Sequence, residues 1–302
     1  MAFLFSLIAI GFILAKLDVI PKNTESVLSK LENFIFMPAL VMGTFIKNFT
    51  FNNIKNYSSL LFGSIVVLLA AIAVSMLAVR LCTNDKYLQN IYLYGLCFSN
   101  FGFMGIAVVN ALFPSISFEY ILFTIVLWIG IYAWGAPVLL MGSVGEKVSF
   151  VQRLKNFANP MFIGMAIGML IGLVNIPVPG FIGNLVDSLG ACMSPLAMLL
   201  TGMTVARSKL GEILKIKSIY VISAIRLIIY PGIFLVLAYF LPMSRTFVIC
   251  TLCSLAMPLG LNTIVIPAAY GKDTKVASGM ALVSHLLSCL TIPLIFACLE
   301  YI

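Results

Sequence analysis

The stretch at residues 99–105 reads Ser99-Asn100-Phe101-Gly102-Phe103-Met104-Gly105, and a second stretch at residues 257–263 reads Met257-Pro258-Leu259-Gly260-Leu261-Asn262-Thr263. Each lies at the middle of an apolar span and places an asparagine beside residues that loosen a helix. In hydrocarbon, an open backbone group is costly unless protein, water or ligand satisfies it. The two stretches therefore predict membrane helices that are interrupted where they line a cavity.

Two explanations remain open for each interruption. Glycine and proline are common in membrane helices, and the asparagines could simply bond to neighbouring helices. Interruptions at corresponding places in two halves of a chain instead favour half-helices that cross at the bilayer midplane. Their N-termini would present N–H groups and positive dipole ends to a central site, which favours a small anion such as a carboxylate.

The rest of the chain is apolar enough to need lipid as its solvent. Of its 302 residues, 62% are hydrophobic and 9% are charged, which leaves too little polar surface for a water-soluble globule. The net charge of +8 comes from basic residues scattered through short loops, a pattern that argues against nucleic-acid binding. Apolar runs of membrane-spanning length predict ten transmembrane helices, near residues 2–17, 28–47, 58–81, 88–112, 118–141, 159–175, 181–205, 217–240, 246–270 and 276–299.

The basic residues predict how the chain is oriented. Of the 18 Lys and Arg residues, fourteen fall in one set of alternate loops and three in the other, with Arg226 inside a helix. Because cytoplasmic loops retain positive charge, we expect a multi-pass protein of the cytoplasmic membrane with both termini outside. The longest connection, residues 142–158, is expected to be cytoplasmic and to separate a repeat at 1–141 from one at 159–302. With five helices each, the second repeat is inverted, which is typical of transporters.

The order and spacing of several short motifs resemble the auxin efflux carrier family, in its bacterial organic-acid permease type. The motifs are Ile10-Gly11-Phe12-Ile13-Leu14, Phe36-Met37-Pro38-Ala39-Leu40, Asn100-Phe101-Gly102-Phe103-Met104-Gly105, Asn159-Pro160, Arg226 with Pro231, and Met257-Pro258. The resemblance covers essentially the whole chain. It implies an all-α integral membrane fold of ten helices in two inverted five-helix repeats, similar to the bile acid sodium symporters. It also implies that helices four and nine cross to form the substrate site, and that the substrate is an organic acid such as malate or malonate.

The resemblance assigns roles to two residues. Asn100 matches a substrate-contacting asparagine of the plant carriers, and Pro258 matches the proline at the crossing of helix nine. Where the plant carriers have a proline before the asparagine, this chain has Ser99, so the first interruption is expected to rely on the two glycines that follow. The plant carriers also use an acidic and a basic residue in helix three, and the span 58–79 has neither. Auxin is therefore not the expected substrate.

Ionisable residues inside the predicted helices are candidates for charge pairing or ion coupling. Arg226 could pair with a carboxylate substrate, or it could snorkel or bond carbonyls freed near Pro231. His285 could carry a proton, and Asp187 could bind a coupling proton or sodium ion. The structural alternatives are a hydrogen bond for His285 and a capping or interfacial role for Asp187, and the latter is also expected of Glu32 and Glu119.

Together these features predict a secondary transporter that moves a small organic anion by alternating access, with helices three to five and eight to ten moving against helices one, two, six and seven. The alternative is an ion-independent channel or uniporter. An intramembrane enzyme is disfavoured, because the chain has one histidine and no HExxH or GxSxG motif, and we expect no catalytic residue. The predicted substrate site comprises Asn100, Gly102, Gly105, Pro258, Gly260, Asn262 and Arg226, with Asp187 and His285 as coupling candidates.

The expected partners are the organic anion and the lipid bilayer, with a homodimer left open. No cofactor or metal site is expected, and coupling to H⁺ or Na⁺ is left open. The seven cysteines lie almost entirely in apolar runs, where a packing role is expected.

Overall fold

The computed structural model describes residues 2–21, 23–141, 155, 157–207, 216–269 and 271–299. In these ranges every regular element is a helix, and one isolated antiparallel bridge joins Ser99 to Leu259. The predicted connection at 142–158 lies mostly outside the described residues. The all-α prediction is confirmed for the part of the chain that is described.

The elements include α-helices, π-helical turns (η1, η2, η4 and η5) and one 3-10 turn (η3). In chain order they are α1 (Ala2–Lys16), α2 (Thr24–Leu31), η1 (Glu32–Phe36), α3 (Met37–Asn48), α4 (Phe51–Cys82), α5 (Lys86–Cys97), η2 (Phe101–Gly105), α6 (Ile106–Leu112), η3 (Pro114–Ile116), α7 (Ser117–Gly130), η4 (Ile131–Met141), α9 (Pro160–Val174), α10 (Gly180–Ala191), α11 (Met193–Arg207), α13 (Lys217–Ala224), η5 (Ile225–Ile229), α14 (Tyr230–Phe240), α15 (Arg245–Leu255), α16 (Asn262–Ala269) and α17 (Lys275–Cys298).

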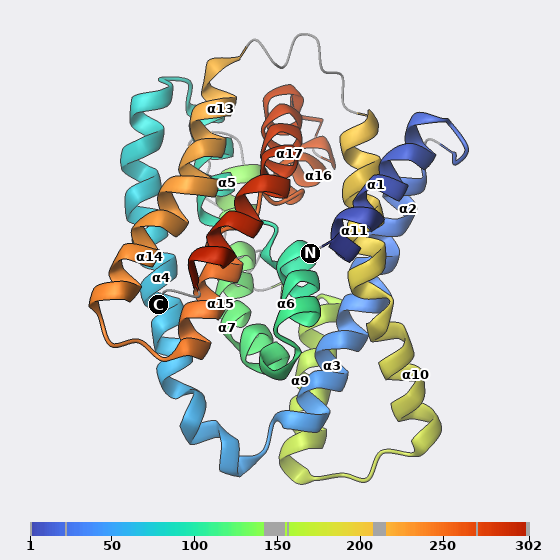
Figure 1. The fold of residues 1–302 in the computed structure, drawn as a ribbon. Coiled ribbons are helices and arrows are strands. Elements are labelled where there is room, and N and C mark those ends of the chain that lie inside the picture. The colour runs from blue at the N-terminus through green and yellow to red at the C-terminus, as the bar shows by residue number, and fades with distance from the viewer. Residues whose placement is uncertain are drawn as a thin grey trace. The chain divides into compact units, whose positions relative to one another are not determined.

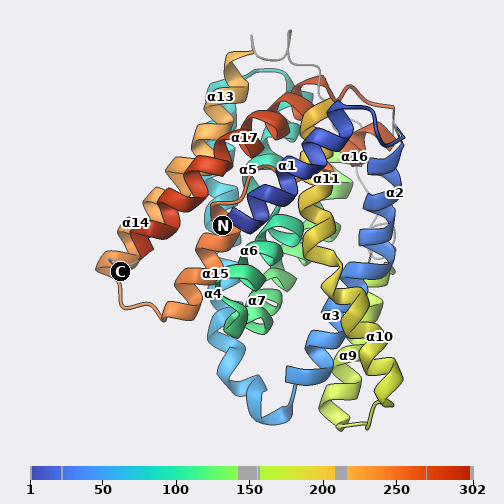
Figure 2. The same cartoon turned by 45° about the vertical axis from the view of Figure 1, so that its right-hand side comes forward.

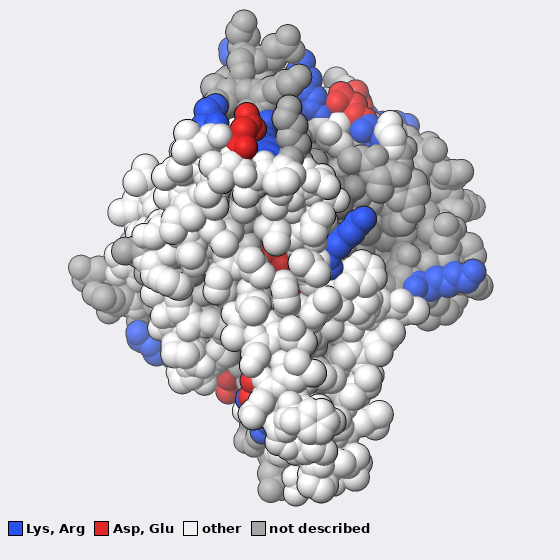
Figure 3. Space-filling model, turned by 90° about the vertical axis from the view of Figure 1, so that its right-hand side faces the viewer, with Lys and Arg blue, Asp and Glu red and all other residues white. Residues whose placement is uncertain are grey.

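Several of these helices can cross a bilayer. Many of their large apolar side chains are exposed, among them Leu69 and Leu77 on α4 and Val236 on α14. Figure 3 shows a face with wide uncharged areas and few charged side chains. Such a surface is stable only against lipid. Within the described residues, five spans are long and apolar enough to cross a membrane: Tyr57–Cys82, Pro114–Pro137, Gly180–Arg207, Lys217–Phe240 and Lys275–Cys298.

One compact unit contains Met1–Leu61, Ile106–Leu122 and Leu154–Arg207. In it α1 packs along α11, and α3 packs against α9 and α10 (Figures 1 and 2). Glycines permit these close approaches. A Cβ on Gly202 would lie 2.0 Å from the carbonyl oxygen of Ile8, so α1 and α11 are in contact backbone to backbone.

The second compact unit contains Phe62–Gly105, Phe123–Arg153 and Ser208–Ile302. In this unit α13 and η5 pack against α17, α14 packs against α15, and α5 packs against η4. Cys250 and Cys253 are fully buried in α15, and all seven cysteines of the chain are free. The buried thiols therefore act as small apolar side chains in the core.

Prolines explain two of the π-helical turns. In η1 the N–H of Met37 donates to the carbonyl of Glu32, five residues earlier, and Pro38 comes next in the chain. In η5 the same kind of bond joins Tyr230 to Ile225, again directly before a proline. Proline lacks an N–H, and its ring crowds the carbonyl four residues earlier. The wider turn accommodates the ring, and the helix continues.

The structure corrects three of the predicted helix ranges. The range 58–81 begins seven residues earlier, at Phe51. The range 28–47 begins four residues earlier, at Thr24, and the range 181–205 is divided at Cys192 between α10 and α11. The count of ten helices and the inverted repeats stay predictions. Each compact unit draws on both halves of the chain, so the units are a separate feature from the repeats.

Candidate functional site

Both interrupted stretches leave the helical conformation, and there they contact each other. Asn100 donates its backbone N–H to the carbonyl of Pro258 at 2.8 Å, and Ser99 pairs with Leu259 as an antiparallel bridge. Helices α5 and α15 end just before this contact, and η2 and α16 begin just after it. The second compact unit therefore contains two broken helices joined at their breaks, a feature we call the crossing (residues 98–100 and 256–261).

Residues of the second stretch explain why the crossing is close. Pro258 disfavours a helical conformation at Met257, so α15 ends before it. A Cβ on Gly260 would lie 3.0 Å from the carbonyl oxygen of Ser99, tighter than ordinary van der Waals contact. Gly260 thus lets the two backbones approach within hydrogen-bonding distance.

The glycines of the first stretch have a different role from the predicted one. Both lie in η2, after the interruption, so the expectation that they make the break is wrong in detail. A Cβ on Gly102 would lie 2.3 Å from the ring of Trp128, and the N–H of Gly105 donates to the carbonyl of Asn100 at 3.0 Å. Gly102 therefore allows η2 to pack tightly against Trp128, and the backbone bond of Gly105 closes the first turn after the break.

Asn100 and His285 are brought together at the crossing. Asn100 is 2% exposed, and its amide nitrogen lies 3.2 Å from Nε2 of His285. Nδ1 of the same ring lies 2.7 Å from the carbonyl oxygen of Ala281. A ring that donates from Nδ1 to this carbonyl can accept the amide N–H at Nε2. The histidine thereby fixes the orientation of the asparagine side chain.

The amide oxygen of Asn100 is left open by this arrangement. Oδ1 is buried and has no hydrogen-bond partner among the described residues. An unmet buried acceptor costs about 1–3 kcal/mol. The crossing therefore presents an acceptor that a ligand with a hydroxyl or N–H group can satisfy.

Other polar groups of the crossing are paired within the same unit. The amide nitrogen of Asn262 donates to the hydroxyl of Tyr94 at 3.3 Å, and the N–H of Leu259 donates to the hydroxyl of Ser284 at 3.1 Å. These bonds hold the extended segment between α15 and α16 against α5 and α17. The segment is thus positioned by side chains from two further helices.

Arg226 stabilises the ends of both interrupted helices. It is 1% exposed, and its guanidinium donates to the carbonyls of Leu96 at 2.8 Å, Ser254 at 2.5 Å and Met257 at 3.2 Å. Leu96 and Ser254 lie in the last turns of α5 and α15, where carbonyls lack helical donors and the dipole is negative. The snorkelling alternative is wrong because the side chain is buried. The guanidinium does bond carbonyls, but they lie at the ends of α5 and α15 and beside Pro258, not near Pro231 as expected. A cavity of about 10 Å³ beside it has room for about one water molecule.

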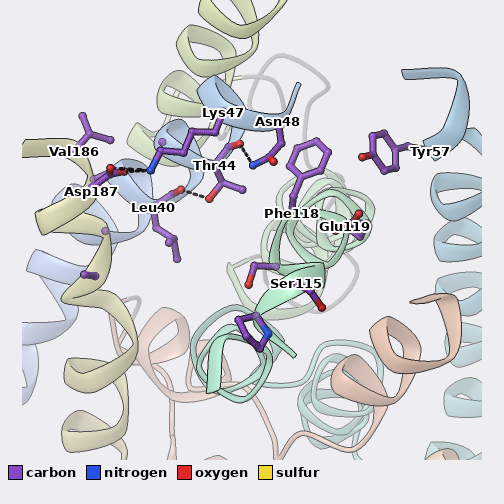
Figure 4. Close-up of a pocket in the computed structure, with 16 residues that line it drawn as sticks. Leu40, Thr44, Lys47, Asn48, Tyr57, Ser115, Phe118, Glu119, Val186 and Asp187 are labelled. Carbon is purple, nitrogen blue, oxygen red and sulfur yellow. Dashed lines mark hydrogen bonds and ion pairs between the residues drawn. The ribbon is translucent and has the colours of Figure 1, made fainter. Parts of the chain in front are cut away.

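The first compact unit contains a cavity of its own (Figure 4). It has a volume of about 520 Å³, which suits a small solute, and it is lined by α3, α10, residues 114–119 and Tyr57. Lys47 reaches across it and bonds both carboxyl oxygens of Asp187 at 2.7 Å. The two side chains are 59% and 48% exposed. Asp187 is therefore half of an exposed ion pair rather than a helix cap, and Glu119 also lines this cavity.

One buried acid was misjudged from the sequence. Glu32 was expected to be a capping or interfacial residue, but its side chain is 0% exposed. The helix begins at Thr24, so Glu32 lies more than two turns inside it. The signal that could have located it is Asn23 followed by Thr24 and Glu25, because such residues are typical of a helix start and would have placed Glu32 inside the helix.

The long apolar helices and the polar crossing buried in one unit define the chain as a polytopic helical membrane protein. The family model for membrane transport proteins matches residues 1–153 and 144–296, so the chain belongs to this family, which includes the auxin efflux carriers. The predicted family is thereby confirmed. A comparison with curated proteins gives no match.

Proposed function

We propose that the protein is a secondary transporter for a small organic anion of the malate or malonate kind. It works in the cytoplasmic membrane, with both termini outside, by alternating access. Membership of the membrane transport protein family supports transport as the activity. The observation that supports the binding site and its substrate is the open amide oxygen of Asn100, which is buried where the two broken helices meet.

The electrostatics of the crossing favour an anion. The first turns of η2 and α16 follow the contact directly, and helix N-termini attract negative charge. Arg226 adds a full positive charge, and its bonds to carbonyls leave this charge in place. Arg226 therefore acts on the anion through the field and by positioning the helix ends, without needing to touch it.

The open acceptor favours a hydroxy acid within this class. A carboxylate offers only acceptors, whereas the hydroxyl of malate can donate to Oδ1 of Asn100. A site whose buried polar group stays unpaired rejects the analogue that lacks the matching group. Malate is accordingly expected to bind more tightly than succinate, which has the same two carboxylates and no hydroxyl.

The composition of the compact units supports alternating access. The first unit contains the predicted helices one, two, six and seven, and the second contains most of helices three to five and eight to ten. This division separates the helices proposed to form the scaffold from those proposed to move. The crossing belongs wholly to the second unit, so the substrate would travel with it.

The test is uptake of radiolabelled malate into proteoliposomes, with and without imposed proton or sodium gradients. We expect uptake by the wild type and at least a tenfold loss in Asn100→Ala, about 1.4 kcal/mol of lost interaction. The matched control is Asn110→Ala, because Asn110 lies on α6, where it bonds Ser117 and Ser194 within the first compact unit. Full uptake by a folded Asn100→Ala protein would remove the crossing as the binding site. Uptake that runs only down the malate gradient and ignores both ion gradients would support the channel or uniporter alternative.

A further inference from the structure

Glu32 is a buried acid that the proposed function does not use. Its side chain is 0% exposed, and neither carboxyl oxygen has a hydrogen-bond partner in the part of the chain that the structure describes. Two other acids of the same compact unit form ion pairs: Glu25 bonds Arg207 at 2.8 Å, and Asp187 bonds Lys47 at 2.7 Å. Glu32 takes part in neither ion pair.

The helices packed against η1 bring no free cation to this carboxyl. They are α2, α3, α9, α10 and α11. The cations of α3 and α11, Lys47 and Arg207, are held by the two other acids, and Lys30 on α2 is exposed. No charged residue occurs in α9. On these helices, the charged side chains near Glu32 are therefore exposed or paired with another charge, and the other surroundings are apolar.

A carboxylate in such surroundings takes up a proton. An ionised carboxyl without a donor or a cation is far too costly in an apolar interior, so the group becomes neutral instead. The observed arrangement therefore fits the protonated form of Glu32. Release of the proton requires a conformation in which water or a cation reaches the carboxyl.

The local backbone offers a place for such a change. Glu32 begins the π-helical turn that precedes Pro38, and its carbonyl accepts the N–H five residues later. Single π turns inside α-helices occur often at functional sites. A sodium ion is a poorer occupant, since it needs several oxygen ligands and the described residues hold no group of three acidic, His or Cys side chains that could bind a metal.

From these observations we infer that Glu32 is a proton-binding site and that its proton couples transport to the proton gradient. The carboxylate takes a proton from water when it is reached from one side and returns it when it is reached from the other, and no other bond changes. The coupling rests on the proposed function, whereas the proton binding does not. Neither Asp187 nor the crossing is required for it.

The first experiment tests proton binding without a substrate. Infrared spectra of the purified protein at neutral pH should show the carbonyl band of a protonated carboxyl, and Glu32→Gln should lack it. The matched control is Asp18→Asn, because Asp18 is exposed and its backbone has a φ of 51°, which asparagine tolerates well. Absence of the band from the wild type, or its persistence in folded Glu32→Gln, would overturn the inference.

The second experiment tests the coupling in proteoliposomes. For the wild type, an imposed proton gradient should change malate uptake several-fold. For Glu32→Gln, the ratio of uptake with and without the gradient should fall to unity, while exchange of internal for external malate continues. A normal gradient response in Glu32→Gln would refute coupling through this residue. If the wild type shows the infrared band and carries no organic anion, the proposed function fails and the proton site stands.

Discussion

Replacing Arg226 by alanine should destabilise the crossing and impair transport without changing substrate preference. The variant leaves the carbonyls of Leu96 and Met257 without their donor. The carbonyl of Ser254 loses one of its two donors and keeps the hydroxyl of Ser99, which donates to it at 2.6 Å. Each of the two unmet carbonyls costs about 1–3 kcal/mol, and the lost bond from the charged guanidinium to Ser254 costs about 1.5–3 kcal/mol. Removing a centred arginine from the membrane recovers about 2.5–3.5 kcal/mol. The net loss of stability is then about 3 kcal/mol.

Thermal unfolding followed with a thiol-reactive dye measures this loss. Cys97, Cys250 and Cys253 are at most 5% exposed and lie in the same compact unit, so they report its opening. A loss of about 3 kcal/mol should lower the Tm by roughly 6–12 °C. The control is Arg245→Ala, which removes an exposed arginine at the start of α15 and should leave the Tm within about 2 °C, since surface substitutions usually cost under 0.5 kcal/mol.

Transport decides whether Arg226 touches the substrate. A positioning residue should, when removed, lower the uptake of mono- and dicarboxylates by the same factor. An unchanged Tm together with a selective loss of dicarboxylate uptake would refute the carbonyl-bonding role. Arg226 would then be a direct partner of the second carboxylate.

Three further predictions concern other features of the structure. Gly202→Ala should sharply reduce the yield of folded protein in fluorescence-detected gel filtration, because its Cβ would lie 2.0 Å from the carbonyl oxygen of Ile8. The control Gly183→Ala should keep the wild-type yield, because a Cβ there meets nothing within 4 Å. Lys47→Ala should lower stability by no more than about 1 kcal/mol in thermal unfolding followed by circular dichroism, because exposed ion pairs contribute little. A larger loss would show that the first compact unit depends on the pair with Asp187. Malate should compete with labelled malate at lower concentration than succinate, and equal competition would show that the open amide oxygen of the crossing does not bind a hydroxyl.

The sequence predicted the crossing better than it predicted the helix ends. A break in a membrane helix can be predicted from asparagine, glycine and proline inside an apolar span. Each of these residues disfavours a regular helix at its own position or at a neighbouring one. The bond from Asn100 to Pro258 follows from these local signals combined with the family resemblance. The division between α10 and α11 at Cys192 has no such signal, because the residues around it are helix-compatible.

Side-chain partners were harder to predict than breaks. The sequence left Arg226 between a substrate carboxylate and backbone carbonyls, and only the packing of η5 against α17, with α5 and α15 close by, decides which atoms it reaches. The pairing of Asn100 with His285 joins residues that are 185 positions apart. A local sequence motif cannot indicate a pairing between residues so far apart in the chain. The partner of a buried polar residue therefore depends on the tertiary structure.

Glu32 and Arg226 together indicate how this chain keeps ionisable groups inside a membrane. Both lie in π-helical turns that precede prolines, where the wider turn changes the direction of the side chains relative to a regular helix. Arg226 cannot become neutral, so it is satisfied by three carbonyls freed at broken helix ends. A glutamic acid can become neutral, so Glu32 needs no partner while it holds a proton. The arginine is therefore suited to a permanent structural role, whereas the acid is suited to a change of state during transport.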